Sequence, residues 1–286
     1  VKVNGEGKAL GDLIQQDIYK IIDNYSTHQV FDNLGRKTQE INPDGGITET
    51  VYDAFNNIVK IIDPNGNSAF NYYNAVGQLV YQIDPEGYVT YNDYDHNGNA
   101  IETIRYSSKL NKTYDEHTSI TQIENWINEP GFINQEKDQR TVKTYTDRGQ
   151  EETITYYGES GETFIERFEY DAFGNKEKVY DKANQLWEYD YDALGRKTHQ
   201  WSPEVKYVTD ASSPVVLTET ARIETRYEYD AFGNQTHEYE ASGTSFERVT
   251  VTEYDKNNNV KKVHMPAKEV YLKGLVTITA GKELDA

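Results

Sequence analysis

One feature constrains the fold of this chain more than any other: an aromatic residue, followed by Asp and then by Gly three residues later, recurs along most of its length. Asn or Thr replaces the Asp in two copies, and Asn replaces the Gly in two others. The first four aromatic residues are 21 residues apart, and a fixed period of this size is typical of stacked supersecondary units. The nine copies begin at Phe31, Tyr52, Tyr73, Tyr94, Tyr145, Tyr170, Tyr191, Tyr229 and Tyr254.

Each regular repeat contains a second turn signal, in which Pro lies twelve residues after the aromatic residue. These signals are Asn42–Gly45, Asp63–Gly66 and Asp84–Gly87. Pro presets φ at the first central position of a turn, and Gly, or Asn as at Asn184 and Asn258, accepts a positive φ. Two turns per period, separated by segments of ordinary strand length, predict two strands per repeat.

The amino-acid composition supports a β fold without a thick core. Leu, Ile, Val and Phe supply only about a fifth of the residues, close to the level at which a highly charged chain is suspected of disorder. The chain holds 24 Tyr, and aromatic residues suit half-buried pleated surfaces. The predicted fold is therefore mainly β: tandem antiparallel β-hairpin repeats that form a continuous twisted or spiral sheet, with one or two short helical insertions.

One position within the repeat predicts how neighbouring hairpins stack. The residue ten positions after the motif aromatic is large and apolar, so the hairpins are expected to align it into one side-chain ladder. Elsewhere the strands do not alternate cleanly between apolar and polar residues, so both faces of the sheet are expected to reach water. The ladder residues are Ile41, Ile62, Ile83, Ile104, Tyr180, Trp201 and Tyr239.

The period is interrupted at four places, where the sequence predicts insertions. Between Tyr94 and Tyr145, apolar residues recur at helical spacing over residues 118–128, which predicts a helix inside an insertion at about 106–140. Pro203 and Pro214, with neighbouring Ser residues, predict a loop insertion at about 203–222. The two remaining interruptions, at 158–161 and 241–243, predict longer hairpin tips.

The chain is expected to have three parts. Residues 1–27 form an N-terminal capping segment with a short helix at 10–22, residues 28–265 form the hairpin array, and residues 266–286 close it. Terminal strands of a repeat array expose unpaired backbone groups unless something covers them. We expect the helix to cover the first edge and Val270–Ile278 to fold back on the last one, so the isolated chain is predicted to be a monomer or a weak dimer.

The net charge of −19 argues against nucleic acid and anionic membranes as partners, because both are bound mainly through Lys and Arg. No stretch reaches the roughly 20 apolar residues that cross a bilayer, so membrane insertion is not predicted. The absence of Cys excludes disulfides, thiolate metal sites and Cys nucleophiles, and it leaves the compartment open. No cofactor is predicted.

The residues expected to matter are structural positions of the repeat, and no catalytic, cofactor-binding or metal-binding residue is predicted. Gly174, Gly195 and Gly233 are expected at positive φ in the turn after the motif aromatic, where a β-branched residue would be strained. The full set is Phe31, Gly35, Tyr52, Tyr73, Gly77, Tyr94, Gly98, Tyr145, Gly149, Tyr170, Gly174, Tyr191, Gly195, Tyr229, Gly233 and Tyr254.

Two patterns mimic metal sites. Asp93–Gly98 resembles the opening of a calcium loop, but the twelfth position is Ile104 where such a loop needs a bidentate Glu. We favour a turn in which the Asp side chain bonds its own backbone. His199 and His237 each lie eight residues after a motif aromatic, so they are expected near one another on one face. Two imidazoles without a third ligand make a weak metal site, and solvated strand histidines are the favoured interpretation.

Enzyme motifs are absent, so the chain is expected not to be an enzyme. It contains no Ser nucleophile elbow, phosphate loop or metalloprotease pair, and carboxylate pairs such as Glu151-Glu152 are common in any acidic chain. The Tyr rows have two interpretations: cross-strand pairs that stabilise the sheet by about 0.2–1 kcal/mol each, or a sugar-binding surface. We favour the first, because regular spacing follows from the repeat alone.

On these repeats, residues 28–265 resemble the YD-repeat, or Rhs, family of large secreted and cell-surface proteins. The resemblance implies a long β-sheet that spirals into a shell, which encloses a toxic polypeptide or forms part of an adhesive stalk. This chain lacks the family's Asp-Pro-rich self-cleaving segment, and nothing after Met265 resembles a toxin domain.

The function that this resemblance implies is a structural scaffold, secreted or at the cell surface, with any export signal outside this chain. The implied partners are flanking repeats of the same parent polypeptide and an enclosed toxin. The alternative is a carbohydrate- or host-surface-binding module that uses the tyrosine-rich sheet to bind a surface glycan.

Overall fold

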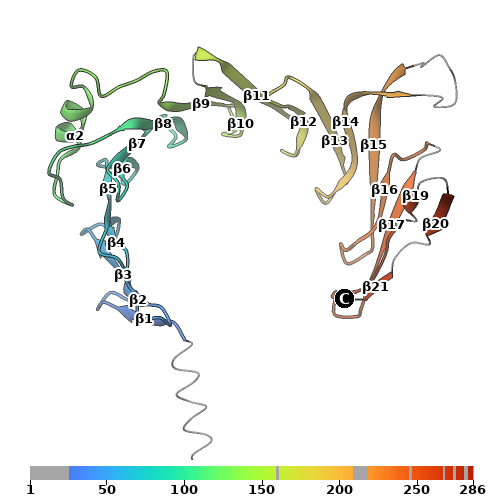
Figure 1. Ribbon diagram of the computed structural model, residues 1–286, viewed down its shortest axis with the longest axis horizontal. Helices are drawn as coiled ribbons and strands as arrows, with labels where there is room; N and C mark the ends of the chain where they lie inside the picture. Colours follow the sequence, from blue (N-terminus) through green and yellow to red (C-terminus); the bar gives the residue numbers. More distant parts are fainter. Residues whose placement is uncertain are drawn as a thin grey trace, which may run out of the picture. The chain divides into compact units, whose positions relative to one another are not determined.

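The computed structural model describes residues 26–158, 161–208, 218–244, 247–266, 268–272, 275–279 and 283–285. Within them the chain is mainly β, with one α-helix, and strands follow one another as antiparallel hairpins (Figure 1). The fold class predicted from the repeat is confirmed. The predicted helix at residues 10–22 lies outside the described residues.

The elements follow the repeat closely. Before the helix the strands are β1 (His28–Phe31), β2 (Lys37–Ile41), β3 (Ile47–Tyr52), β4 (Ile58–Ile62), β5 (Ser68–Tyr73), β6 (Leu79–Ile83), β7 (Tyr88–Tyr94) and β8 (Ala100–Lys109). The helix is α2 (Ile120–Ile127). After it come β9 (Gln139–Tyr145), β10 (Glu151–Tyr157), β11 (Thr163–Tyr170), β12 (Lys176–Tyr180), β13 (Leu186–Tyr191), β14 (Lys197–Val208), β15 (Thr218–Tyr229), β16 (Gln235–Glu240), β17 (Arg248–Tyr254), β18 (Val260–His264), β19 (Lys268–Leu272), β20 (Leu275–Thr279) and β21 (Glu283–Asp285).

Consecutive strands pair antiparallel, which makes the sheet a meander. The ladder shifts register at the motif aromatic: Val51 pairs with Lys60, but Tyr52 pairs with Ile58. The same shift occurs at the motif hairpins of Phe31, Tyr73, Tyr94, Tyr170, Tyr191, Tyr229 and Tyr254. It is the signature of a hairpin loop that ends in a left-handed residue and a bulge. The motif therefore sets the hairpin register as well as the turn.

The chain divides into two compact units. The first contains residues 1–142 and 156–162, and the second contains residues 143–155 and 163–286. In the first unit, consecutive hairpins run from β1 to β8, and in the second they run from β11 to β18 (Figure 1).

A packed core lies in the first unit, where α2 and its flanking residues meet β5–β8 (Figure 1). Ile123 and Ile127 of α2 are buried in one cluster with strand residues such as Phe70, Tyr81 and Ile83. Burying a side chain of this size contributes about 1.5–3 kcal/mol. The insertion therefore gives this part of the sheet a core that the composition alone did not suggest.

The predicted helix at 118–128 is confirmed. Its N-cap is Ser119, whose hydroxyl accepts a hydrogen bond from the Gln122 backbone N–H, and it ends at Asn128. The Tyr72 hydroxyl donates to the Asp115 carbonyl oxygen at 2.8 Å, which fastens the insertion to β5. Burial raises the pKa of Tyr72, so its hydroxyl stays protonated and able to donate.

The apolar ladder has a less uniform environment than the sequence predicted. Ile83 is fully buried beneath the helical insertion. Ile104 is half-buried and packs against the same core cluster. The remaining ladder residues, including Ile62 and Trp201, are half-buried and lie outside that cluster. Both faces reach water there, as predicted.

The loop predicted at about 203–222 is mostly strand in the described residues, so this prediction was wrong. β14 continues to Val208 and β15 begins at Thr218, and the two strands pair across this region. Pro203 is accommodated because the register shifts between Trp201 and Glu204. A bulge removes the need for the backbone N–H that Pro lacks. Residues 209–217 lie outside the described residues.

The last edge of the array is closed by a different segment from the one predicted. β21 pairs with β18, with Val263 opposite Leu284. Val270–Ile278 was expected to play this part, but β19 and β20 instead pair with each other in a separate two-stranded sheet. The strands β19 and β20 form their backbone hydrogen bonds with each other, so the free side of β18 pairs with β21. The described part of the chain contains no helix with the length and apolar character needed to span a bilayer.

Candidate functional site

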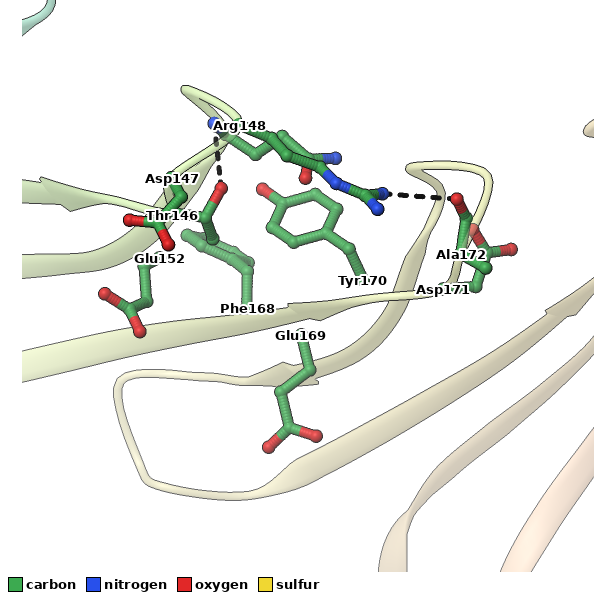
Figure 2. A pocket seen from close by; sticks show the side chains of 10 residues that line it. Thr146, Asp147, Arg148, Glu152, Phe168, Glu169, Tyr170, Asp171 and Ala172 are labelled. Atoms are coloured by element: carbon green, nitrogen blue, oxygen red, sulfur yellow. Dashed lines mark hydrogen bonds between the residues drawn. The ribbon is translucent and has the colours of Figure 1, made fainter.

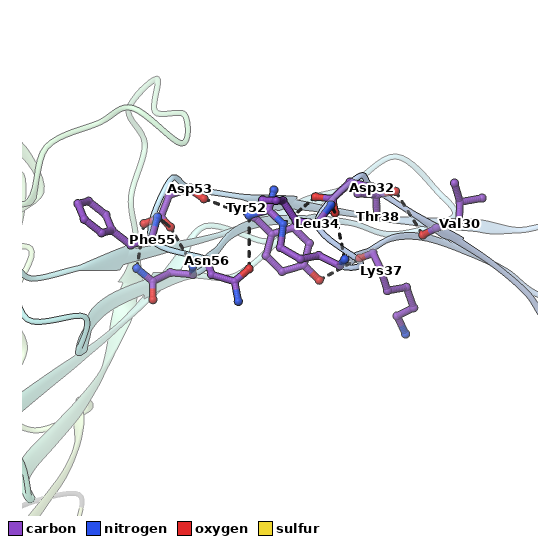
Figure 3. Close-up of polar contacts among 11 residues, drawn as sticks. Val30, Asp32, Leu34, Lys37, Thr38, Tyr52, Asp53, Phe55 and Asn56 are labelled. Atoms are coloured by element: carbon purple, nitrogen blue, oxygen red, sulfur yellow. Dashed lines mark hydrogen bonds and ion pairs between the residues drawn. The ribbon is translucent and has the colours of Figure 1, made fainter.

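The repeated turn after the motif aromatic is built on one hydrogen-bonding scheme. In the Asp53 turn, one carboxylate oxygen accepts hydrogen bonds from the backbone N–H groups of Phe55 and Asn57, both at 2.8 Å (Figure 3). The other oxygen accepts from the Asn57 side-chain amide at 2.9 Å. Short polar side chains that bond their own backbone in this way favour turns. Equivalent backbone bonds form at Asp32, Asn74, Asp95, Asp171, Asp192, Asp230 and Asp255.

The fourth residue after the aromatic occupies the left-handed region in every described motif turn. The φ angles are 94° for Gly174, 75° for Gly195 and 91° for Gly233, which confirms the prediction for these three glycines. Asn258 occupies the same position of its motif turn with a φ of 64°. Asn184, which lies in the second turn of its repeat, has a φ of 57°. The predicted tolerance of these turns for Asn is confirmed as well.

Hydrogen bonding lowers the pKa of the turn carboxylates. For Asp171 and Asp230 the main cause is donation by the side-chain amides of Asn175 and Asn234, and backbone N–H groups add to it. In Asp192 the backbone N–H and the guanidinium of Arg196 lower the pKa. The carboxylates are therefore charged and committed to their own turns at neutral pH.

The hydroxyls of the motif tyrosines connect each hairpin to the one before it. Tyr52 donates to the backbone carbonyl oxygen of Lys37 at 2.9 Å (Figure 3). The acceptor is always the residue six positions after the preceding motif aromatic, which is the first residue of the previous hairpin's second strand. The other pairs are Tyr73 with Ile58, Tyr94 with Leu79, Tyr170 with Glu151, Tyr191 with Lys176, Tyr229 with Lys197 and Tyr254 with Gln235, at 2.7–3.0 Å.

These tyrosines are half-buried, and they do not form an open aromatic face. Burial raises the pKa of Tyr170, Tyr191 and Tyr229 above its usual value, so each hydroxyl is protonated and available as a donor. Sequence reasoning treated these residues as cross-strand pairs and missed the hydroxyl contact. Their fixed place relative to the preceding repeat was the signal for it.

A third contact joins consecutive motif turns through the residue five positions after the aromatic. The Arg36 guanidinium lies over the Tyr52 ring, 4.6 Å from its centroid, and donates to the Asp53 carbonyl oxygen at 3.2 Å. Arg196 makes the same two contacts with Tyr229 and Asp230. This position is Arg, Asn or Gln in all nine copies, a pattern that sequence reasoning overlooked.

Two motif positions depart from the scheme. Phe31 has no hydroxyl, belongs to the first strand and is 54% exposed. At Tyr145 the following residue is Thr146, whose hydroxyl accepts from the Gln150 backbone N–H in place of a carboxylate. The neighbouring Arg148 donates to the Ala172 carbonyl oxygen and so reaches the next motif turn (Figure 2).

Two cavities of the described residues are lined by charged and aromatic side chains. A cavity of about 510 Å³ lies beside Arg148 and Tyr170 (Figure 2). A second, of about 700 Å³, is lined by residues including Arg140 and Tyr157, and Arg140 pairs with Glu102 and lies over the Tyr157 ring. In these cavities Arg148 and Arg140 are thus engaged in contacts with other parts of the protein.

The calcium-like segment forms a turn. Asp95 accepts from the backbone N–H groups of Asn97 and Asn99 and from the Asn99 side chain, while Asp93 accepts from the Tyr94 N–H. Within the described ranges no three His, Cys, Asp or Glu residues are placed to hold a metal ion. The favoured interpretation of Asp95 as a turn residue is confirmed by these bonds.

His199 and His237 lie on β14 and β16, with β15 between them, so they are not brought together as predicted. His199 stacks on Trp201 with ring centroids 5.5 Å apart, and His237 stacks on Tyr239 at 5.7 Å. The reason is the hairpin meander, which places equivalent positions of consecutive repeats two strands apart. Each imidazole packs along its own strand.

Comparison with known proteins gives a likeness in fold. No protein-family model matches the chain, and no curated protein matches it. The crystal structure of TcdB2-TccC3-TEV matches with a TM-score of 0.50 and 17% identity, over 85% of this chain and 13% of that chain. TcdB2-TccC3 without its hypervariable C-terminal region gives 0.47 and 16%, over 85% and 13%. A Photorhabdus luminescens Tc holotoxin pore gives 0.48 and 12%, over 89% and 14%.

The first of these matches shows that the hairpin fold also occurs within a much longer solved chain. The chain spans about 13% of the length of that solved chain. At this level of identity the likeness concerns the fold, and the residues of the repeat carry the argument for function.

Proposed function

We propose that the chain is a non-catalytic structural scaffold: a segment of a larger YD-repeat shell or stalk, in a secreted or cell-surface protein, that encloses or presents a toxic polypeptide. The observation that carries this proposal is the use of the motif side chains. Asp closes the turn, Tyr bonds the previous hairpin, and in two copies Arg at the fifth position reaches the next turn. The repeated motif residues therefore hold the hairpin array together, which is the role expected of a shell or stalk segment.

The environment of the tyrosines favours the scaffold over the carbohydrate-binding alternative. A sugar-binding platform needs an exposed aromatic face, whereas the motif tyrosines are half-buried and donate their hydroxyls to backbone carbonyl oxygens. The likeness to a TcdB2-TccC3 chain supports a place in a toxin-associated shell. Flanking repeats of the parent polypeptide would then be the first partners of this segment.

The shell hypothesis is tested by protease protection in the parent polypeptide. We expect an enclosed segment to resist a broad-specificity protease until urea opens the repeats, because a closed wall excludes the enzyme. Gly195→Val strains a turn whose φ is 75° and should lower the urea concentration at which cleavage starts. A Gly195→Asn variant is the matched control, since Asn258 already occupies this turn position. Equal cleavage rates with and without urea would contradict enclosure.

The glycan alternative is tested on the isolated chain with a glycan array. The scaffold proposal predicts no saturable binding. Saturable binding that Tyr191→Ala abolishes, while circular dichroism shows an unchanged β spectrum, would reverse the ranking of the two functions.

A further inference from the structure

The two faces of the sheet in the first unit differ in charge. Residues paired directly across antiparallel strands point to the same face, and residues next to each other along a strand point to opposite faces. Thr50 pairs with Ile61, and Ile61 pairs with Ala69, so these three residues lie on one face of β3–β5. The pairs from β2 to β9 assign the other residues to the two faces in the same way.

One face carries no charged residue among the described pairs of β3–β7, although the chain has a net charge of −19. We call it the neutral face. Its charged members lie at the borders and are ion-paired: Glu40 with Lys37 on β2, and Arg105 on β8 with Asp84. Its uncharged members are Thr48, Thr50, Tyr52, Ile58, Ile61, Ala69, Asn71, Tyr73, Leu79, Gln82, Thr90, Asn92, Tyr94, Ala100 and Thr103.

The amide side chains of the neutral face bond within the sheet. The Asn71 side chain donates to the Ile58 carbonyl oxygen at 2.9 Å and accepts from the Gln82 side chain at 3.1 Å. Asn92 donates to the Leu79 carbonyl oxygen at 3.2 Å and accepts from the Thr103 hydroxyl at 3.0 Å. These amides therefore hold neighbouring strands together and are not available to grip a ligand.

The opposite face is charged, and the helical insertion packs on it. Glu49 and Lys60 lie on this face, and Lys60 forms an ion pair with Glu116 of the insertion at 3.5 Å. Phe70 and Ile83 of the same face belong to the core cluster that contains α2 (Figure 1). The insertion is therefore confined to the side away from the neutral face.

The chemistry of the neutral face excludes most tight partners. Nucleic acid and anionic lipid are bound through Lys and Arg, a stable interface with a folded protein has an aromatic and apolar core, and a sugar platform needs an exposed ring. Between the half-buried motif tyrosines this face instead presents half-exposed Thr and Ala side chains, such as Thr50, Ala69 and Thr90. It fits a polypeptide that is held without being bound, because uncharged groups neither attract nor repel its acidic and basic segments at contact distance.

We propose that the neutral face of the first unit is turned towards the enclosed polypeptide, and that the charged face with the helical insertion is turned to the outside of the shell. The inference rests on the proposed scaffold and adds to it the lining that the enclosed chain meets. With this lining, segments of either charge are stored and leave without ion pairs to the wall. With the insertion outside, the enclosed volume stays free for the chain.

The test is thiol labelling in the parent polypeptide, with any cysteine elsewhere replaced by Ser, since this segment contains none. Thr50→Cys places a thiol on the neutral face, and Ser68→Cys places one on the opposite face. Both residues are half-exposed, and both substitutions are nearly isosteric. The reagent is a polyethylene-glycol maleimide too large to pass through a closed wall. We expect Thr50→Cys to react at least about tenfold more slowly than Ser68→Cys, because its labelling requires the wall to open.

Thr90→Cys and Gln39→Cys repeat the comparison on other strands of the same two faces. All four variants should label equally fast in urea, and protease resistance of the enclosed segment shows that each variant assembles. Equal labelling of Thr50→Cys and Ser68→Cys in a parent that still protects its segment, or protection of Ser68→Cys, would overturn the inference and leave the scaffold proposal standing. A parent that never protects its segment would contradict the scaffold proposal and the inference with it.

Discussion

Replacing Tyr191 with Phe tests the hydroxyl contact between hairpins. The substitution keeps the ring and removes the hydroxyl that donates to the Lys176 carbonyl oxygen at 2.9 Å. A hydrogen bond of this kind contributes about 0.5–1.5 kcal/mol net. The environment is partly buried and the acceptor can recover some bonding from water, so we expect the free energy of unfolding to fall by about 1 kcal/mol.

Tyr180 on the adjacent strand β12 provides the matched control. In the described structure its hydroxyl has no hydrogen bond, and its ring lies under the Arg167 guanidinium at 4.0 Å, a contact that Phe retains. Tyr180→Phe therefore removes the same atom without the same bond. We expect a change within about 0.5 kcal/mol.

Both variants are measured by urea unfolding followed by tryptophan fluorescence. Trp187 pairs with Val179, and Trp201 pairs with Glu188, so both report on the strands β12–β14 that surround the two substitutions. If both variants lower the free energy of unfolding equally, the hydrogen bond of the Tyr191 hydroxyl does not stabilise the fold, and the reasoning is refuted.

Three further predictions follow from the turns and the ends. Gly195 has a φ of 75°, a left-handed conformation that Asn adopts more readily than Val. Gly195→Val should therefore lower the free energy of unfolding by about 1–2 kcal/mol and Gly195→Asn by less, as measured by thermal melts. The pKa of Asp171 is lowered from its ordinary value of 3.8, so its contribution to the free energy of unfolding is complete above that pH and is lost as the pH falls through the folded pKa. The urea midpoint of the parent chain should therefore be flat from about pH 7 to 5 and fall below about pH 4, and the fall should be less steep in Asp171→Asn. Deleting residues 1–26 should promote dimerisation or aggregation by light scattering, and a truncated chain that stays monomeric and equally stable would show that this segment is not a cap.

The turns could be predicted from the sequence because their chemistry is local. Asp, Gly and Asn at fixed offsets specify the hairpin loop within five residues, and the positive φ of Gly174 and Asn258 follows from that spacing. The helix at α2 was predictable for the same reason, from apolar spacing and the Ser119 cap.

Contacts between repeats were harder to predict because they depend on the offset of one hairpin against the next. The bulge at the motif aromatic sets that offset, and only then does the Tyr191 hydroxyl reach Lys176. The same reasoning explains the core: the sequence predicted a helix, but its burial against β5–β8 depends on how a long insertion folds back. His199 and His237 were misplaced because a spacing of one repeat is two strands, not one.

Electron cryomicroscopy of the parent polypeptide tests the central claim most directly. The scaffold account predicts that residues 28–265 form part of the wall of an enclosed volume, with consecutive hairpins joined at the motif tyrosines. A map in which these residues stand apart from the rest of the molecule and border no enclosed volume would contradict it.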